Sequence, residues 1–252
     1  MTTAIGVDIG GSGIKAALVD LDRGTFIGER VRISTPQPAT THAVVGTVHD
    51  VVAELGAAGP VGITIPAVVR GGVVESAANI DEGWIGTDAR ALFGPVLARP
   101  LEVLNDADAA GLAEVAYGAG RDRRGVVLML TLGTGIGSAL FVDGVLVPNT
   151  EFGHLHLHHG EAEAWASDAA RTRDDLSWHH WAERLGHYLR TLESLVQPDL
   201  VIIGGGVSRK AERFLPHIEL RHAELVAAEL QNGAGIIGAA RHAPRAAGTS
   251  PR

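Results

Sequence analysis

The chain has 252 residues, of which 46% are hydrophobic, enough to bury a sizeable core in one large or two smaller domains. Its formal net charge of -8 argues against general affinity for nucleic acids or membrane surfaces, because such partners select a basic footprint. The absence of cysteine excludes disulfides and thiolate metal sites. A first strand beginning by Ala4 and the lack of an apolar run near the ~20 residues of a membrane span predict no signal peptide and a cytoplasmic location.

The first half of the chain predicts an α/β layer. Three short strands joined by glycine turns form an antiparallel meander. A helix capped by Thr40 or Thr41 follows, with valines along one face and Gly56 as its stop. Two buried strands then lead to an alanine-rich helix that begins at Asp106. The strands are predicted at 4–9, 13–20, 25–33, 61–65 and 101–105, and the last helix at 106–117.

The second half repeats this plan. A second meander is predicted at 126–132, 137–142 and 144–147, and a long helix from Trp178 to Gln197 carries aromatic and leucine side chains on one face. A buried strand at 200–203 and a final helix at 232–241 complete it. The repetition implies an internal duplication with a cleft between two lobes. The lobes are predicted at 1–105, completed by a C-terminal helix at 232–243, and at 106–231, with a frayed tail at 244–252.

Two glycine-rich hairpins, at 8–13 and 133–137, indicate phosphate binding. Without a Cβ atom, glycine lets the backbone approach a phosphate and turn its N–H groups inward as an anion nest. Any tight hairpin also favours glycine, and neither segment has the Walker A or the Rossmann pattern. Asp8 favours phosphate binding over a purely structural turn, because a charge inside an apolar strand is costly and usually serves to bind a partner.

Asn105 and Asp106 stand at a strand-to-helix junction between the two hairpins. A carboxylate there can act as the base of a phosphotransferase that acts on a hydroxyl, but aspartate is also a favoured N-cap residue, and the residue alone fits both roles. Asp108 and Glu114 are expected to be solvated helix residues.

A third polar group follows the second meander. Glu151, His154 and Glu163 can accept and donate hydrogen bonds to vicinal sugar hydroxyls. The alternative is that His154, His156 and His158 form one wet strand face by alternation. A metal site built from these histidines is less favoured, because the other expected ligands are absent.

The order and spacing of these segments, from about Ile5 to Ala240, resemble the ROK (repressor, open reading frame, kinase) family of sugar kinases. Within that family the chain looks most like the actinobacterial polyphosphate glucokinases. The resemblance is carried by the motifs Asp8-Ile-Gly-Gly-Ser-Gly-Ile-Lys15, Asn105-Asp-Ala-Asp-Ala-Ala-Gly111, Leu132-Gly-Thr-Gly-Ile-Gly137, Glu151-Phe-Gly-His154 and Gly204-Gly-Gly-Val-Ser-Arg-Lys210.

This resemblance implies an actin-like, hexokinase-type (RNase H-like) α/β fold of two lobes with an interlobe active-site cleft. It implies a glucokinase that transfers a phosphoryl group from polyphosphate, ATP or both to the 6-hydroxyl of glucose, with Mg2+ as cofactor, as a homodimer without nucleic-acid or membrane partners. Asp106 would be the base, and Asp8 would hold Mg2+, through water. The sugar ligands would be Asn79, Asn105, Asp106, Glu151, His154 and Glu163. The phosphate ligands would be Asp8, Gly10, Gly11, Ser12, Gly13, Lys15, Thr131, Gly133, Thr134, Gly135, Gly204, Gly205, Gly206, Arg209 and Lys210.

The chain departs from the family pattern in one respect. Many members bind structural zinc through cysteines after the histidine, and this chain has none, so no zinc site is expected, and His156, His158 and His159 receive no role. An ATP-dependent kinase for another hexose and a non-catalytic sugar sensor stay open as alternatives. A repressor is not expected, because a DNA-binding module would have to precede the first strand. Lys15 and Lys210 are the two lysines of the chain and lie in candidate phosphate segments, which favours polyphosphate as a donor.

Overall fold

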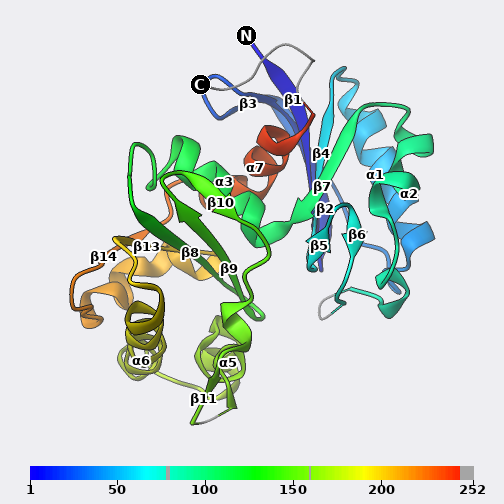
Figure 1. Cartoon of the computed structure of the whole chain (residues 1–252). Coiled ribbons are helices and arrows are strands. Elements are labelled where there is room, and N and C mark those ends of the chain that lie inside the picture. Colours follow the sequence, from blue (N-terminus) through cyan, green and yellow to red (C-terminus); the bar gives the residue numbers. More distant parts are fainter. Residues whose placement is uncertain (78–79, 159, 245–252) are drawn as a thin grey trace. The chain divides into compact units, whose positions relative to one another are not determined.

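The computed structural model describes residues 1–77, 80–158 and 160–244, which divide into two compact units (Figure 1). The first unit comprises Met1–Ala113 and the described chain from Gly233 on, and the second comprises Glu114–Asn232. The first lobe is predicted to end at residue 105, whereas the boundary between the units follows Ala113. Asn79, His159 and the tail beyond residue 244 lie outside the described residues. No described helix is both long and apolar enough to cross a bilayer.

Each unit is built on a five-stranded sheet, and the two sheets share one pattern. An antiparallel meander of three strands continues into two parallel strands, in the orders β3-β2-β1-β4-β7 and β10-β9-β8-β13-β14. The strands of the first sheet are β1 (Thr3–Gly10), β2 (Gly13–Asp20), β3 (Thr25–Ile33), β4 (Val61–Ile65) and β7 (Leu101–Asn105). Those of the second are β8 (Val126–Leu132), β9 (Ile136–Val142), β10 (Val145–Val147), β13 (Leu200–Gly204) and β14 (Glu224–Ala227). The repeated meander expected from the glycine turns is confirmed.

Helices and short ladders complete the described chain. The α-helices are α1 (Thr41–Leu55), α2 (Ala89–Leu97), α3 (Asp106–Tyr117), α4 (Ala162–Ala166), α5 (Asp168–Arg173), α6 (Trp178–Val196) and α7 (Ala234–His242). The 3-10 segments are η1 (Glu82–Trp84), η2 (Phe152–His154), η3 (Gly206–Arg213), η4 (Leu215–His217) and η5 (Gln231–Gly233). Two small antiparallel ladders pair β5 (Val69–Arg70) with β6 (Val73–Val74), and β11 (His156–Leu157) with β12 (Gly160–Glu161).

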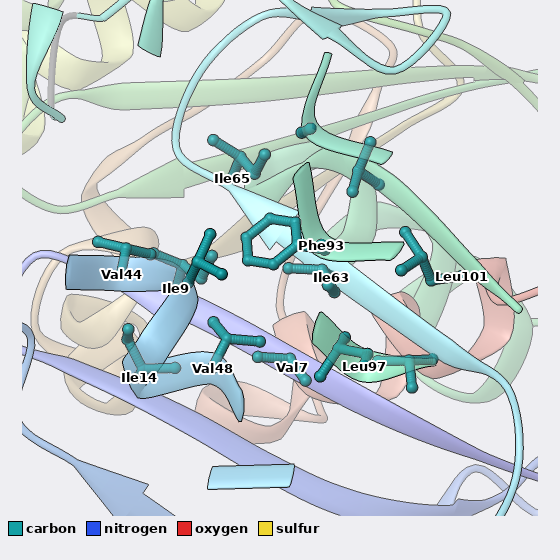
Figure 2. Packing of buried hydrophobic residues seen from close by; sticks show 14 of the residues in the cluster. Val7, Ile9, Ile14, Val44, Val48, Ile63, Ile65, Phe93, Leu97 and Leu101 are labelled. Atoms are coloured by element: carbon teal, nitrogen blue, oxygen red, sulfur yellow. The ribbon is translucent and has the colours of Figure 1, made fainter. Parts of the chain in front are cut away.

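The core of the first unit lies between one face of its sheet and helices α1 and α2 (Figure 2). Helix α1 begins where the Thr40 hydroxyl accepts the Ala43 N–H and ends at Gly56, whose φ of 58° suits glycine. Because strand side chains alternate between faces, the large apolar residues of β1 and β4 point toward these helices. They include Val7, Ile9, Ile63 and Ile65, which pack against Val44, Val48, Phe93 and Leu97.

The opposite face of this sheet carries glycine and polar residues. Gly6 of β1 and Gly62 of β4 are register partners, and helix α7 packs directly on both. A Cβ atom at Gly6 would lie 1.9 Å from the carbonyl oxygen of Ile236, and one at Gly62 would lie 1.7 Å from that of Ala239. Glycine at both strand positions is therefore required for the backbone of α7 to approach the sheet this closely.

The core of the second unit is dominated by helix α6, whose apolar face packs on the sheet around Trp181, Leu185 and Tyr188. The same face carries Glu193, which is almost fully buried and accepts three consecutive backbone N–H groups, from Arg221, His222 and Ala223, at 2.9–3.1 Å. Burial alone would raise the pKa of Glu193, but these backbone donors, together with His222, bring it below its usual value.

Two carboxylates expected to be solvated are in fact buried. Glu114 has no exposed surface and accepts the backbone N–H groups of Ala119, Glu229 and Leu230. Asp108 is 2% exposed. The expectation was wrong because two of the donors to Glu114 come from the far end of the second unit, which no local helical pattern reveals.

Candidate active site

Asp8, near the end of β1, lies on the α7 face of the first sheet and faces both neighbouring strands. Its carboxylate accepts the Thr64 hydroxyl at 3.1 Å and pairs with the Lys15 ammonium at 3.2 Å. An ideal Cβ atom on Gly235 would lie 3.0 Å from Asp8 Oδ1, so the carboxylate also lies against the first turn of α7, where a negative charge is favoured by the helix dipole. The Asp8 carboxylate is therefore held in place by Thr64, Lys15 and the first turn of α7.

The hairpin that follows Asp8 is fixed from outside by three side chains. Gly10 pairs with Gly13, and the carbonyl groups of Gly10, Gly11 and Ser12 accept hydrogen bonds from Thr35, Gln37 and Arg32 respectively. With these carbonyls engaged on its outer side, the turn is held in one conformation, which suits a loop whose N–H groups bind an anion.

A pocket of about 330 Å³ opens beside this hairpin, entirely within the first unit. Its size suits a small polar ligand such as a monosaccharide. Its lining residues are Ile9, Gly10, Gly11, Thr35, Gln37, Pro38, Ala39, Pro66, Ile80 and Asp81.

The sequence left two roles open at this strand-to-helix junction, helix cap and catalytic base, and Asn105 is the residue that caps the helix. The side-chain oxygen of Asn105 accepts the N–H groups of Ala107 at 2.8 Å and Asp108 at 3.1 Å, so Asn105 caps α3, and its amide nitrogen donates to the Ala67 carbonyl at 3.0 Å. Asp106 is the first residue of the helix and is partly exposed. Its carboxylate accepts the N–H of the adjacent Ala107 at 2.9 Å, and the cap of α3 is supplied by Asn105.

Asp106 and the hairpin lie at one edge of the first sheet. Strands β1, β4 and β7 are mutually parallel, with Asp8 opposite Thr64 and Ile65 opposite Asn105. Their carboxyl ends therefore meet, and the base candidate lies two strand spacings, about 10 Å, from the end of β1. The carboxyl edge of parallel strands is where α/β folds usually bind ligands.

The second unit repeats this arrangement with its own glycine loop. Gly133, Thr134 and Gly135 form a tight turn after β8 in which the Gly133 N–H donates to the Gly135 carbonyl at 3.0 Å. At the end of β13, Gly204 pairs with Thr131, and Gly205 has a φ of 81° and packs so closely on Leu132 that a Cβ atom would meet its carbonyl oxygen at 2.2 Å. The structure thus brings the two predicted phosphate segments of the second unit, 133–135 and 204–206, to adjacent strand ends.

The three predicted sugar ligands of the second unit also converge. His154 lies 3.8 Å from Glu151 and 3.9 Å from Glu163, and Glu163 accepts the Ile136 N–H at 3.1 Å, next to the glycine loop. Gly153 allows the turn between them to pack on Ile136, since a Cβ atom there would meet the Ile136 carbonyl oxygen at 2.2 Å. A further member, Glu161, lies 3.4 Å from His154 and escaped the sequence analysis because no motif marks it.

Burial raises the pKa of two groups here. Burial raises the pKa of Glu151, an effect that His154 opposes and Glu163 reinforces. Tyr188 is fully buried, and burial, together with the negative charge of Glu163, raises the pKa of its phenol. Among the described residues, the Tyr188 hydroxyl has no hydrogen-bond partner.

The alternation of His154, His156 and His158 suggested one strand face, but these histidines do not lie along one strand. His154 ends the 3-10 segment η2, and only His156 belongs to strand β11. The ligand atoms of His154, Glu161 and Glu163 lie within 4.8 Å of one another, a spacing that could hold a metal ion. The absence of zinc therefore stays a prediction.

Two α/β units with one repeated sheet order, each with a glycine turn after the first strand of its meander, define a sugar kinase of the actin-like, hexokinase-type (RNase H-like) fold. The ROK family model matches residues 4–167, and the chain belongs to the ROK family. The predicted fold class and family are confirmed.

Individual relatives resemble the chain over nearly its whole length. It is 51% identical over 236 residues to the polyphosphate glucokinase of Mycobacterium tuberculosis (strain CDC 1551 / Oshkosh), covering 93% of this chain and 89% of the relative. The structure is similar to that of the inorganic polyphosphate/ATP-glucomannokinase from Arthrobacter sp. strain KM, with a TM-score of 0.90, 51% identity and coverage of 95% and 97%. It is also similar to a ROK family glucokinase from Streptomyces griseus in complex with glucose and AMPPNP, with a TM-score of 0.84, 26% identity and coverage of 96% and 99%.

Proposed function

We propose that this chain is a glucokinase that transfers a phosphoryl group from inorganic polyphosphate, and also from ATP, to the 6-hydroxyl of glucose. Its near full-length similarity to a polyphosphate glucokinase and to a polyphosphate/ATP-glucomannokinase supports this proposal. The single observation that carries the chemistry is the position of Asp106, a partly exposed carboxylate at the carboxyl edge of the parallel strands, next to Asn105, which caps α3.

In the proposed reaction, Asp106 accepts the proton of the glucose 6-hydroxyl. The sugar oxygen then forms a bond to the terminal phosphorus of the donor while the bridging phosphorus–oxygen bond breaks. The products are glucose 6-phosphate and a polyphosphate shortened by one residue, or ADP when ATP is the donor. A base in this position typically contributes about 10² to 10⁴ in rate. The glycine turns at 10–13 and 133–135 would bind phosphate oxygens through their N–H groups.

Asp8 would hold Mg2+, directly or through water. Its carboxylate is 19% exposed and lies beside the Thr64 hydroxyl, so the oxygen donors that Mg2+ prefers are present. When bound, Mg2+ would neutralise charge on the transferring phosphoryl group. Lys15, paired with Asp8, would add a positive charge beside the same phosphates.

Glucose would be recognised through its hydroxyls by Glu151, His154 and Glu163. Their carboxylate and imidazole atoms provide acceptors and a donor at neighbouring positions. The amide nitrogen of Asn105 has two N–H groups and uses one on Ala67, and Asn79 joins this set on the family resemblance. The same resemblance carries the expectation of a cytoplasmic homodimer, which size-exclusion chromatography with light scattering would test.

Asp106→Asn tests the proposal. Asparagine keeps the shape and hydrogen bonding but removes the base, so we expect kcat to fall by about 10² or more while calorimetry shows glucose binding retained. Asp50→Asn, an exposed aspartate on α1, is the matched control and should leave kcat unchanged. Wild-type turnover by the Asp106→Asn variant would remove Asp106 from the mechanism. Glucose phosphorylation with ATP and with polyphosphate, measured side by side, tests the donors.

The name of the Arthrobacter relative favours mannose as a second acceptor. Competition between glucose and mannose for turnover would establish whether this chain accepts both sugars.

A further inference from the structure

Three cations in the second unit surround one tryptophan ring. The guanidinium of Arg171 lies 4.2 Å from the centroid of a Trp178 ring, the ammonium of Lys210 lies 5.6 Å from it, and the guanidinium of Arg213 lies 5.8 Å from it. Lys210 and Arg213 therefore both lie over the same indole, at 5.6 Å and 5.8 Å from a ring centroid. Their separation is comparable to the Debye length of about 10 Å at 0.1 M salt, so their positive fields overlap.

The ring that gathers these cations is rigidly held. Trp178 stacks on Phe214 at 6.1 Å and packs edge-on against Trp181 at 5.9 Å, and both of these partners are fully buried. A cation over an exposed aromatic face gains about 0.5–1 kcal/mol, which is of the same order as the repulsion between two unit charges about 11 Å apart near a protein surface. The arrangement favours an anionic ligand that relieves this repulsion.

The carboxylates nearby neutralise the cluster only in part. Asp168 pairs with Arg171 at 2.9 Å, and Glu212 lies 3.9 Å from Arg213 with both side chains largely exposed to solvent. Asp174 is already engaged by Arg173 and Arg184. In the described part of the chain, no ion pair joins Lys210 to a carboxylate.

Both segments that carry the cations begin at the glycine loop of the second unit. The Ala169 N–H of α5 donates to the Gly133 carbonyl at 3.0 Å, and Arg171 follows one half-turn later on the same helix. Segment η3, which carries Lys210 and Arg213, starts at Gly206, directly after the close contact of Gly205 with Leu132. A chain of phosphates with one end at this loop would therefore reach the cluster.

We propose that Arg171, Lys210 and Arg213, gathered around Trp178, form a binding site for the phosphate residues of inorganic polyphosphate that lie beyond those held by the glycine loop. This inference rests on the proposed function and adds to it a site for the distant part of the donor. A polyphosphate chain carries a charge on every residue, whereas the charges of ATP end with its triphosphate. The cluster therefore favours polyphosphate over ATP, and the preference decreases as salt screens the contacts.

The test uses the full chain with Lys210→Gln and Arg213→Gln combined. We expect the ratio of kcat/KM for polyphosphate to kcat/KM for ATP to fall on the order of tenfold. The slope of log(kcat/KM) for polyphosphate against log of the salt concentration should become shallower by roughly one to two, since each lost phosphate contact removes about 0.7–0.9 from it. Calorimetric titration with polyphosphate alone should show the same weakening without turnover.

The matched control combines Arg121→Gln with Arg190→Gln. It removes the same charge from exposed positions of the second unit, and Arg190 lies about 18 Å from Trp178 along α6. For this control we expect the ratio of kcat/KM for polyphosphate to kcat/KM for ATP, and the slope against salt, to match those of the wild type. If kcat/KM for polyphosphate fell equally in both double variants, the loss would follow from the change in net charge alone, and the inference would be overturned.

Three other outcomes decide on the inference and on the proposed function separately. A wild-type enzyme that uses polyphosphate, with a Lys210→Gln/Arg213→Gln variant that uses it equally well, would overturn the cluster and leave the proposed function intact. A wild-type enzyme active with ATP and inactive with polyphosphate would refute polyphosphate as the donor, and the cluster with it. A parallel fall with both donors would show that the cations support the loop and do not bind the distant phosphates.

Discussion

Gly62→Ala should displace helix α7 from the first sheet. The new Cβ atom would lie 1.7 Å from the carbonyl oxygen of Ala239, whereas real contacts of this kind are essentially never shorter than 3.0 Å. The helix would have to withdraw by about 1.3 Å, the difference between these distances. Since the contact is with backbone, no side-chain rotation can relieve it.

The withdrawal has a calculable cost. Helix α7 buries Ile236 and Ile237, and burying two such side chains is worth about 3–6 kcal/mol. A gap of this size forfeits roughly half of the contact energy, and overpacking adds about 1–3 kcal/mol of strain. We therefore expect Gly62→Ala to lower the free energy of unfolding by about 3–5 kcal/mol. It should also weaken the site, because the first turn of α7 contacts Asp8.

Gly46→Ala supplies the matched control for this prediction. Gly46 is an exposed residue inside α1, and a Cβ atom there meets nothing within 4 Å. The same substitution should therefore stabilise the protein by about 0.5–1 kcal/mol, because alanine is the better helix former. Urea unfolding followed by far-UV circular dichroism measures both variants. A free energy of unfolding for Gly62→Ala within about 1 kcal/mol of the wild-type value would refute the predicted displacement of α7.

Three further predictions concern polar side chains. Asn105→Ala should lower the melting temperature through the loss of about 1–2 kcal/mol of cap energy, while Asp106→Asn should not; equal melting temperatures would reassign the cap. Glu193→Gln should cost about 2–3 kcal/mol at pH 7 in chemical unfolding. Because folding lowers the pKa of Glu193, the charged carboxylate stabilises the folded protein above the unfolded-state pKa near 4.3, and this stabilisation is lost as the pH falls through the folded-state pKa. The free energies of unfolding of the wild type and Glu193→Gln should therefore converge in acid. A difference that stays constant with pH would contradict this prediction. Glu163→Ala should raise KM for glucose at least tenfold in steady-state kinetics, and an unchanged KM would move the sugar site.

The sequence predicted the parts of the fold that depend on neighbouring residues. Both meanders were predictable because glycine turns separate short apolar runs, and α1 was predictable because its valines recur on one face between Thr40 and Gly56. Helix α2 was not, since Gly94 and Pro95 interrupt its sequence and normally break helices. Strand β14 escaped because it is a short edge strand that depends on β13 for its pairing.

The site was predictable only where a motif marks it. Glu151, His154 and Glu163 belong to segments with a recognisable family pattern, and the structure brings these three together. The cations Arg171 and Arg213 lie in separate segments, α5 and η3, and only the tertiary fold places both beside Trp178 of α6. No spacing between these residues in the sequence predicts that the two cations lie over the same tryptophan.

The scarcity of lysine gives this protein a built-in chemical reporter. An amine-directed reagent would encounter only the α-amino group of Met1, Lys15 beside Asp8 and Lys210 over Trp178. The two lysines lie in different units, Lys15 in the candidate phosphate segment that begins at Asp8 and Lys210 in the one that begins at Gly204. Mass spectrometry of the unmutated protein could therefore follow donor occupancy at each segment separately, as protection of one amine or the other, with Met1 as the internal reference.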